Sequence, residues 1–168
     1  MRCSLAGLAL LLLLAACAGP DYLAEARFDQ GCWPMQDTLR FELPVEAGQA
    51  PQLQVDLTLD AEYRYQNLYL KLRYRGPEGQ SGELLLHDEL VAPTGLWRGE
   101  RRGQEVHWTI EPTPALPATA PGTYQLELFH YMRDSSLCEV YFVGVARAQP
   151  SAQQGGLYPD RTGPEGNL

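Results

Sequence analysis

The chain has 168 residues, with 21 Asp and Glu against 13 Lys and Arg and a formal net charge of −8 at pH 7. This acidic balance argues against nucleic acid as a partner, because phosphate groups are bound by clustered Lys and Arg. It also argues against electrostatic attachment to anionic lipid, and no apolar stretch after Leu14 approaches the roughly 18 residues of a membrane-spanning helix. The length is sufficient for one domain with a hydrophobic core.

Residues 1–16 have the pattern of a lipoprotein signal peptide. Arg2 supplies a positive charge, residues 5–14 form the apolar segment, and Leu14-Ala15-Ala16 precedes Cys17. An apolar segment of about ten residues is too short to cross a hydrocarbon core of roughly 30 Å as a permanent helix. Cleavage before Cys17 and attachment of diacylglycerol to its sulfur would anchor the chain in a lipid bilayer. The alternative is an ordinary secretory signal followed by an incidental cysteine.

Residues 17–30 show little periodicity, and we expect them to form a lipidated tether into a domain of residues 31–147. From Thr38 onward the dominant period is two. Leu53, Val55, Leu57 and Leu59 alternate with polar residues, as in a half-buried strand. The segments of strand length are residues 40–45, 52–60, 68–75, 84–90, 105–111, 124–131 and 139–146.

The spacing of these segments predicts an all-β fold. About seven or eight short strands with Gly and Pro between them, and no amphipathic helix, indicate an antiparallel β-sandwich that is Ig-like or jelly-roll-like. The Pro-rich residues 112–117 break any strand there, because proline cannot donate to a ladder. Residues 148–168 are polar and rich in Gly and Pro, so we expect a disordered tail.

Two of the four cysteines remain after the signal is accounted for. Cys3 leaves with the signal and Cys17 carries the lipid, which leaves Cys32 and Cys138 in a compartment that permits disulfides. A bridge between them would close a loop of about 106 residues and stabilise the fold by roughly 4 kcal/mol in the chain-entropy model. Two buried free thiols are the alternative.

The sequence offers no clear constellation for catalysis, a metal or a cofactor. His87, His107 and His130 lie on different predicted strands, so no spacing places two of them on one face as zinc ligands. No G-x-S-x-G turn, phosphate-binding glycine loop or carboxylate pair at glycosidase spacing occurs, and Ser135-Ser136 fits a polar turn. We therefore expect a protein that is not an enzyme and has no cofactor and no metal site.

Aromatic and polar side chains supply a candidate partner surface. Tyrosine and arginine offer a large contact area together with hydrogen bonds, so a protein or glycan is a suitable partner. The alternative is that tyrosines simply favour strands. A tryptophan between two glycines, as at Trp97, fits a tight bend that either packs the indole under the sandwich or presents it at a rim. The candidate residues are Tyr65, Asn67, Tyr69, Trp97 and Arg98.

Several short motifs, in order along residues 28–147, resemble those of the gliding motility lipoprotein GldH family. They are Trp33 followed by residues 37–41, Tyr65-x-Asn67-Leu68-x-Leu70, Gly95-Leu96-Trp97-Arg98-Gly99, Gly122-Thr123-Tyr124, and His130-Tyr131-Met132-Arg133 with the later Leu137 and Val143-Gly144-Val145. The predicted lipoprotein signal agrees with this resemblance independently. Cys138 departs from it, since a small or apolar residue is expected there, and this departure would accord with a lineage-specific disulfide to Cys32.

The resemblance implies a non-enzymatic envelope lipoprotein of Bacteroidetes that is associated with the gliding machinery and its type IX secretion system. Its partners would be the bilayer, through Cys17, and other envelope proteins; the resemblance carries over no catalytic residues. Ala18-Gly19 lacks an Asp two residues into the mature chain and is not followed by a dense acidic run, which favours the periplasmic face of the outer membrane. A carbohydrate- or substrate-binding envelope lipoprotein is the alternative.

Overall fold

A computed structural model describes residues 20–110 and 112–148. The predicted signal peptide, the predicted lipid site Cys17 and the predicted tail after Ala148 lie outside these residues. No helix within the described part of the chain is long and apolar enough to span a membrane.

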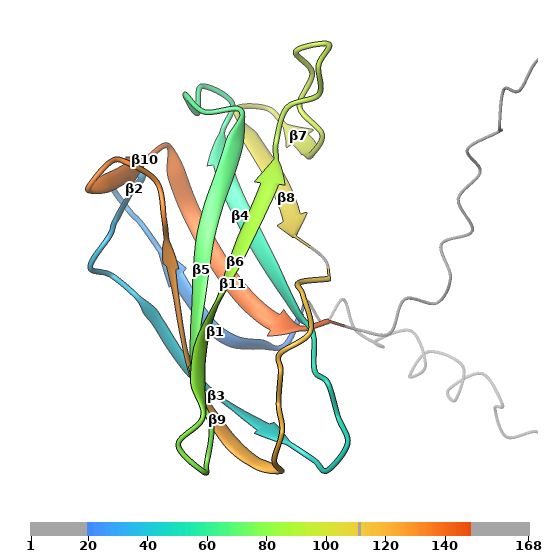
Figure 1. The fold of residues 1–168 in the computed structure, drawn as a ribbon. Coiled ribbons are helices and arrows are strands. Elements are labelled where there is room, and N and C mark those ends of the chain that lie inside the picture. The colour runs from blue at the N-terminus through green and yellow to red at the C-terminus, as the bar shows by residue number, and fades with distance from the viewer. Residues whose placement is uncertain (1–19, 111, 149–168) are drawn as a thin grey trace, which may run out of the picture.

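The described residues form eleven β-strands in antiparallel sheets, which confirms the predicted all-β sandwich (Figure 1). A five-stranded sheet has the order β1-β11-β4-β8-β7, a four-stranded sheet has the order β3-β9-β5-β6, and β10 and β2 form a two-stranded ribbon. The strands are β1 (Tyr22–Arg27), β2 (Cys32–Pro34), β3 (Leu39–Val45), β4 (Leu53–Asp60), β5 (Asn67–Arg75), β6 (Ser81–Glu89), β7 (Glu100–Arg102), β8 (Glu105–Ile110), β9 (Gly122–His130), β10 (Ser136–Cys138) and β11 (Val140–Arg147).

The pairing of the longer strands is that of a jelly roll. Once the three-residue strands β2, β7 and β10 are set aside, the first strand pairs with the last, the second with the seventh, the third with the sixth and the fourth with the fifth. These pairs are β1 with β11, β3 with β9, β4 with β8, and β5 with β6. Of the two predicted sandwich types, the topology therefore selects the jelly roll.

The core lies between the two larger sheets and follows the period of two. In β4 every odd-numbered residue from Leu53 to Leu59 is buried and every even-numbered residue is half-buried. In β5 and β9 the even-numbered residues point inward, as Leu70 and Leu128 do. Because side chains alternate between faces, the odd-numbered residues of β5, β6 and β9 form the outer surface of the four-stranded sheet.

The first strand lies inside the segment that was expected to be a tether. Residues 17–30 contain β1, which pairs with β11 from Tyr22 opposite Ala146 to Arg27 opposite Phe142. The pairing shifts register between Tyr22 and Ala24, and this irregularity interrupts the alternation that sequence patterns rely on. The expected domain boundary at residue 31 is thus wrong, because the sandwich already includes β1.

Candidate docking surface

The outer face of the four-stranded sheet has a charged half and an aromatic half. In the charged half one residue from each strand forms a ladder of alternating sign, in which Arg40, Glu127, Arg73 and Glu83 stand directly opposite one another in register. The ion pairs along the ladder measure 3.0, 3.3 and 2.9 Å. Hydrogen bonds from Arg73 and Lys71 lower the pKa of the Glu83 carboxyl. These charges satisfy one another within the sheet.

The aromatic half contains an open groove of about 980 Å³, which we call the outer groove. The start of β5 supplies one wall, β6 contributes Leu85, and the residues that follow β9 supply the other wall. The lining residues are Tyr65, Asn67, Tyr69, Leu85, Tyr131, Met132, Arg133 and Asp134. Leu85 is 52% exposed and Tyr131 is 53% exposed, although both are large apolar side chains. A groove lined by aromatic side chains with a few polar groups is a typical binding site.

Two stacked arrangements shape the aromatic side of the outer groove. The rings of Tyr69 and His87 lie parallel, with their centroids 4.2 Å apart and an interplanar angle of 11°. The Lys71 ammonium lies 4.0 Å from the centroid of the Tyr131 ring, as in a cation–π contact. One face of Tyr69 is therefore covered by His87, and one face of Tyr131 by Lys71.

Hydrogen bonds attach the segment after β9 to the start of β5. The Tyr131 N–H donates to the Tyr69 carbonyl at 2.7 Å, and the Tyr69 N–H donates to the Met132 sulfur at 3.3 Å. The Tyr65 hydroxyl donates to the Asp134 carboxylate at 2.7 Å, and this bond raises the pKa of Tyr65. The two walls of the outer groove are thus bound to each other by backbone and side-chain groups.

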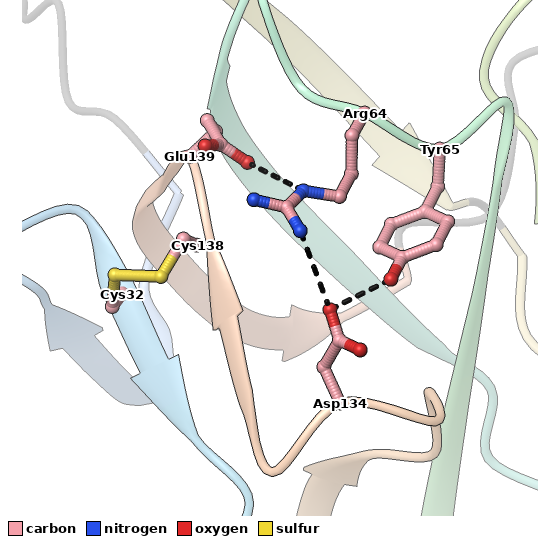
Figure 2. The surroundings of a disulfide bond; sticks show 6 residues. All are labelled: Cys32, Arg64, Tyr65, Asp134, Cys138 and Glu139. Atoms are coloured by element: carbon pink, nitrogen blue, oxygen red, sulfur yellow. Dashed lines mark hydrogen bonds and ion pairs between the residues drawn. A yellow bond between two sulfur atoms is a disulfide. The ribbon is translucent and has the colours of Figure 1, made fainter.

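A disulfide between Cys32 and Cys138 joins β2 to β10, the short strand that follows residues 131–134 in the chain (Figure 2). Trp33 and Leu137, the next opposed pair of this ribbon, are both buried in the core. Figure 2 shows that the disulfide and the Asp134 corner stand at the two ends of β10. Of the two alternatives that the sequence left open for these cysteines, the structure adopts the bridge rather than two free thiols.

Arg64 connects the disulfide ribbon to the outer groove. Its guanidinium lies between Asp134, at 3.9 Å, and Glu139, at 3.8 Å (Figure 2). Glu139 has a positive φ of 62° at the corner between β10 and β11, where its carbonyl accepts from the Asp60 N–H at 2.9 Å. A non-glycine residue in this conformation is uncommon and strained. The contacts that Glu139 makes with β4 and Arg64 stabilise the corner that follows Cys138.

The structure brings three of the five predicted surface residues together and places the other two elsewhere. Tyr65, Asn67 and Tyr69 line the outer groove. Trp97 lies in the loop after β6, where it pairs with Val91 and packs partly against the core, and Arg98 forms an ion pair with Glu89 at 3.2 Å. The expected single surface is therefore divided between the groove and this loop.

Sequence reasoning missed the residues of the second wall and Leu85. Leu85 had a usable signal, because it is an apolar residue at an odd-numbered, outward position between Glu83 and His87. Residues 131–134 had none, since their approach to β5 depends on the pairing of β5 with β9.

The three histidines occupy unrelated places in the described chain. His87 is stacked on Tyr69, and His107 lies on the outer face of the other sheet, 3.3 Å from the Thr58 hydroxyl. His130 is fully buried, packed edge-on against Trp33, and burial lowers its pKa. Among the described residues no group of three or more His, Cys, Asp and Glu is arranged to hold a metal ion.

The fold and the site define a disulfide-linked jelly-roll domain with an aromatic groove on one face. The family model described as GldH lipoprotein matches residues 22–146, from the first residue of β1 to the last but one of β11. This chain belongs to the GldH lipoprotein family, which makes it a gliding-motility-related lipoprotein of the cell envelope. The match begins at the first residue of β1, in agreement with the corrected start of the domain.

The other comparisons add little. No curated protein matches the chain. A solved structure titled "A novel family GH115 4-O-Methyl-alpha-glucuronidase, BtGH115A, with specificity for decorated arabinogalactans" is similar to it at 17% identity and a TM-score of 0.33. That alignment covers 74% of this chain and 14% of the other, and it is too weak to bear on fold or function.

Proposed function

We propose that this lipoprotein is a non-enzymatic docking subunit of the gliding and type IX secretion machinery in the outer membrane of a Bacteroidetes cell. Its role is positional: lipid at Cys17 keeps the domain at the membrane surface, and the outer groove binds another envelope protein. The observation that carries this proposal is the outer groove itself, because exposed Leu85 and Tyr131 lie beside polar groups whose positions are already set by internal hydrogen bonds.

The placement of β1 supports this arrangement. Cys17 precedes Tyr22 by five residues, and such a tether reaches at most about 18 Å. Since β1 is an edge strand of the five-stranded sheet, a lipid at Cys17 would hold the start of that strand close to the membrane. The outer groove lies on the other layer, so it stays open to a partner when the layer that contains β1 lies against the lipid. That partner is periplasmic if the anchor is in the inner leaflet of the outer membrane.

A glycan is a weaker candidate for the groove. Sugar rings bind by stacking on exposed aromatic faces, whereas His87 covers one face of Tyr69 and Lys71 covers one face of Tyr131. Tyrosine with an engaged face still offers its edge and hydroxyl to a protein partner.

The test combines Tyr69→Ala and Tyr131→Ala in the tagged, full-length protein of the native host. Leu96→Ala is the matched control, because Leu96 is 69% exposed and lies outside the outer groove. Proteins that co-purify from solubilised envelopes are compared by mass spectrometry, and gliding and secretion of type IX cargo are scored in the same strains. We expect the groove variant to lose its main protein partner and to be impaired in motility or secretion, while the control behaves as wild type.

Three results would count against the proposal. Retention of every partner by a folded groove variant would exclude the groove as the docking site. A deletion strain with normal motility and secretion would exclude the assigned machinery. Specific binding of an envelope polysaccharide that depends on Tyr69 would favour the carbohydrate-binding alternative. A Cys17→Ala variant tests the anchor separately, since it should leave the membrane fraction.

A further inference from the structure

The two larger sheets have four edge strands in the described part of the chain, and three of them carry features that prevent edge-to-edge pairing. β3 contains Pro44, β1 is interrupted by the register shift after Tyr22, and β7 is three residues long, exposed and charged. Proline, bulges and short charged strands are the usual means by which sheet edges avoid pairing with other chains.

The fourth edge strand, β6, has none of these features. It runs for nine residues, contains no proline or lysine, and pairs with β5 without a register shift. Its centre is the sequence Leu84-Leu85-Leu86, with Leu85 exposed on the outer face. Within residues 20–110 and 112–148, the backbone groups of β6 form hydrogen bonds only with β5 or with side chains of β6 itself.

The charged side chains of β6 are already engaged and do not block its edge. Asp88 accepts a hydrogen bond from the Trp108 indole at 3.0 Å, and Glu83 is paired with Lys71 and Arg73. Glu89 is paired with Arg98. The free edge is therefore a long, regular and locally neutral template for another strand.

We propose that β6 pairs with β6 of a second copy of this chain, antiparallel and about a two-fold axis, to form a continuous sheet across the dimer. This inference shares Leu85 with the proposed docking function but does not rest on it, because it is argued from the free edge of β6 and not from the outer groove. Such an interface is isologous, because both copies use the same strand and, where residue i of one copy meets residue j of the other, residue j also meets residue i.

The residue pattern of β6 selects the register. Directly opposed residues of antiparallel strands point to the same face, so odd-numbered residues must oppose odd-numbered ones. Full overlap of β6 satisfies this rule: Leu85 meets Leu85 of the second copy, Glu83 meets His87, and Leu84 meets Leu86.

The neighbouring registers are less favourable. A shift of two residues in one direction places Glu83 opposite Glu89 in both halves of the interface and Leu84 opposite Asp88. The same shift in the other direction opposes Gly82 to Leu86 and leaves Glu83 opposite Leu85. Like charges directly across a ladder destabilise it, whereas opposite charges and matched apolar pairs stabilise it. Full overlap therefore provides both the longest ladder and the best matched side chains.

The experiment uses Leu85, because a two-fold axis brings this residue opposite itself. Leu85→Cys is introduced into the full-length protein and oxidised in intact envelopes, with Leu96→Cys, at a more exposed position, as the control. Leu85→Lys and Leu85→Thr are purified in mild detergent, and their masses are compared with wild type across a concentration series. Leu85→Lys places two ammonium groups across the axis, whereas threonine is neutral and favours strands.

We expect Leu85→Cys to form a covalent species of twice the monomer mass and Leu96→Cys to form none. Leu85→Lys should weaken dimerisation at least about tenfold, whereas Leu85→Thr should remain dimeric. The proposal is overturned if the wild-type protein is monomeric at every concentration, if folded Leu85→Lys dimerises as well as wild type, or if Leu85→Cys forms no species of twice the monomer mass. Should Leu85→Lys not fold, the cross-link alone decides.

Discussion

The disulfide gives the sharpest test of how this fold is stabilised. Cys32 and Cys138 are separated by 106 residues and are opposed in the β2–β10 ribbon. We expect the double substitution Cys32→Ser and Cys138→Ser to lower the free energy of unfolding while leaving the fold intact. Both cysteines are half-buried, so serine hydroxyls at these positions remain within reach of water.

The expected loss follows from the length of the closed loop. In the chain-entropy model a loop of about 100 residues contributes on the order of 4.7 kcal/mol at 25 °C, because the bridge restricts the unfolded chain. For a domain of about 130 residues the entropy of unfolding near 60 °C is roughly 0.27 kcal/mol/K, so a loss of about 4.7 kcal/mol should lower the melting temperature by about 17 °C. This loss is a large part of the stability of an ordinary domain.

The assay is urea unfolding of the full-length protein in mild non-ionic detergent, followed by tryptophan fluorescence. Buried Trp33 lies next to Cys32 and reports on this region. Wild-type protein under a reducing agent is the matched control and should reproduce the double variant. Thiol labelling before reduction shows that the bridge is formed. A loss below about 1 kcal/mol would refute the loop-entropy argument and imply that the ribbon is held by its buried side chains alone.

Three further variants probe the core and its ionisable group. Burial lowers the pKa of His130 in the folded protein below its value near 6.5 in the unfolded chain. Between these two pKa values the unfolded chain binds a proton that the folded protein does not. As pH falls below about 6.5, the free energy of unfolding should therefore decline by up to about 1.4 kcal/mol per pH unit, until the folded pKa is reached. Urea titrations between pH 7.5 and 5 should show this slope in wild type and not in His130→Leu, and equal slopes would contradict it. Gly144→Ala should cost about 1–3 kcal/mol in thermal unfolding, because its Cβ would lie 2.5 Å from the Tyr22 ring and 2.8 Å from the Phe142 ring; an unchanged melting temperature would mean that these rings move aside freely. Leu70→Ala should cost about 2–5 kcal/mol and the exposed control Leu96→Ala less than about 0.5 kcal/mol, and similar losses for both would contradict the assigned burial of Leu70.

The period of two was sufficient to predict the longer strands after residue 38 and their inward faces. Leu53 to Leu59 alternate without interruption, and the structure buries each odd-numbered residue among them. The same rule failed for β1, where alanines and a register shift weaken the alternation. The period of two could not predict the order of the strands, because a jelly roll pairs its first strand with its last and a local sequence pattern carries no information about such a distant contact.

The candidate surface was predictable only where it follows from a single strand. Asn67 and Tyr69 share one face of β5 because they are two residues apart, so their grouping was a local inference. Asp134 reaches Tyr65 across 69 positions of the chain, and Met132 reaches Tyr69 across 63. Only the chemistry of its side chain places Trp97 in the same candidate surface, and in the structure it lies in the loop after β6, packed against the core.

The proposed anchor and the proposed dimer constrain each other. A two-fold axis that relates two lipidated copies in one membrane must stand along the membrane normal, so the continuous sheet formed through β6 has to lie parallel to the bilayer. The five-stranded sheet carries β1 and hence the tether, which turns that layer toward the lipid. The outer faces of both four-stranded sheets then point away from the membrane on the same side, with Leu85 of each copy at the axis and the two outer grooves on either side of it. A partner with two linked binding segments would occupy both grooves at once and gain avidity without any new contact.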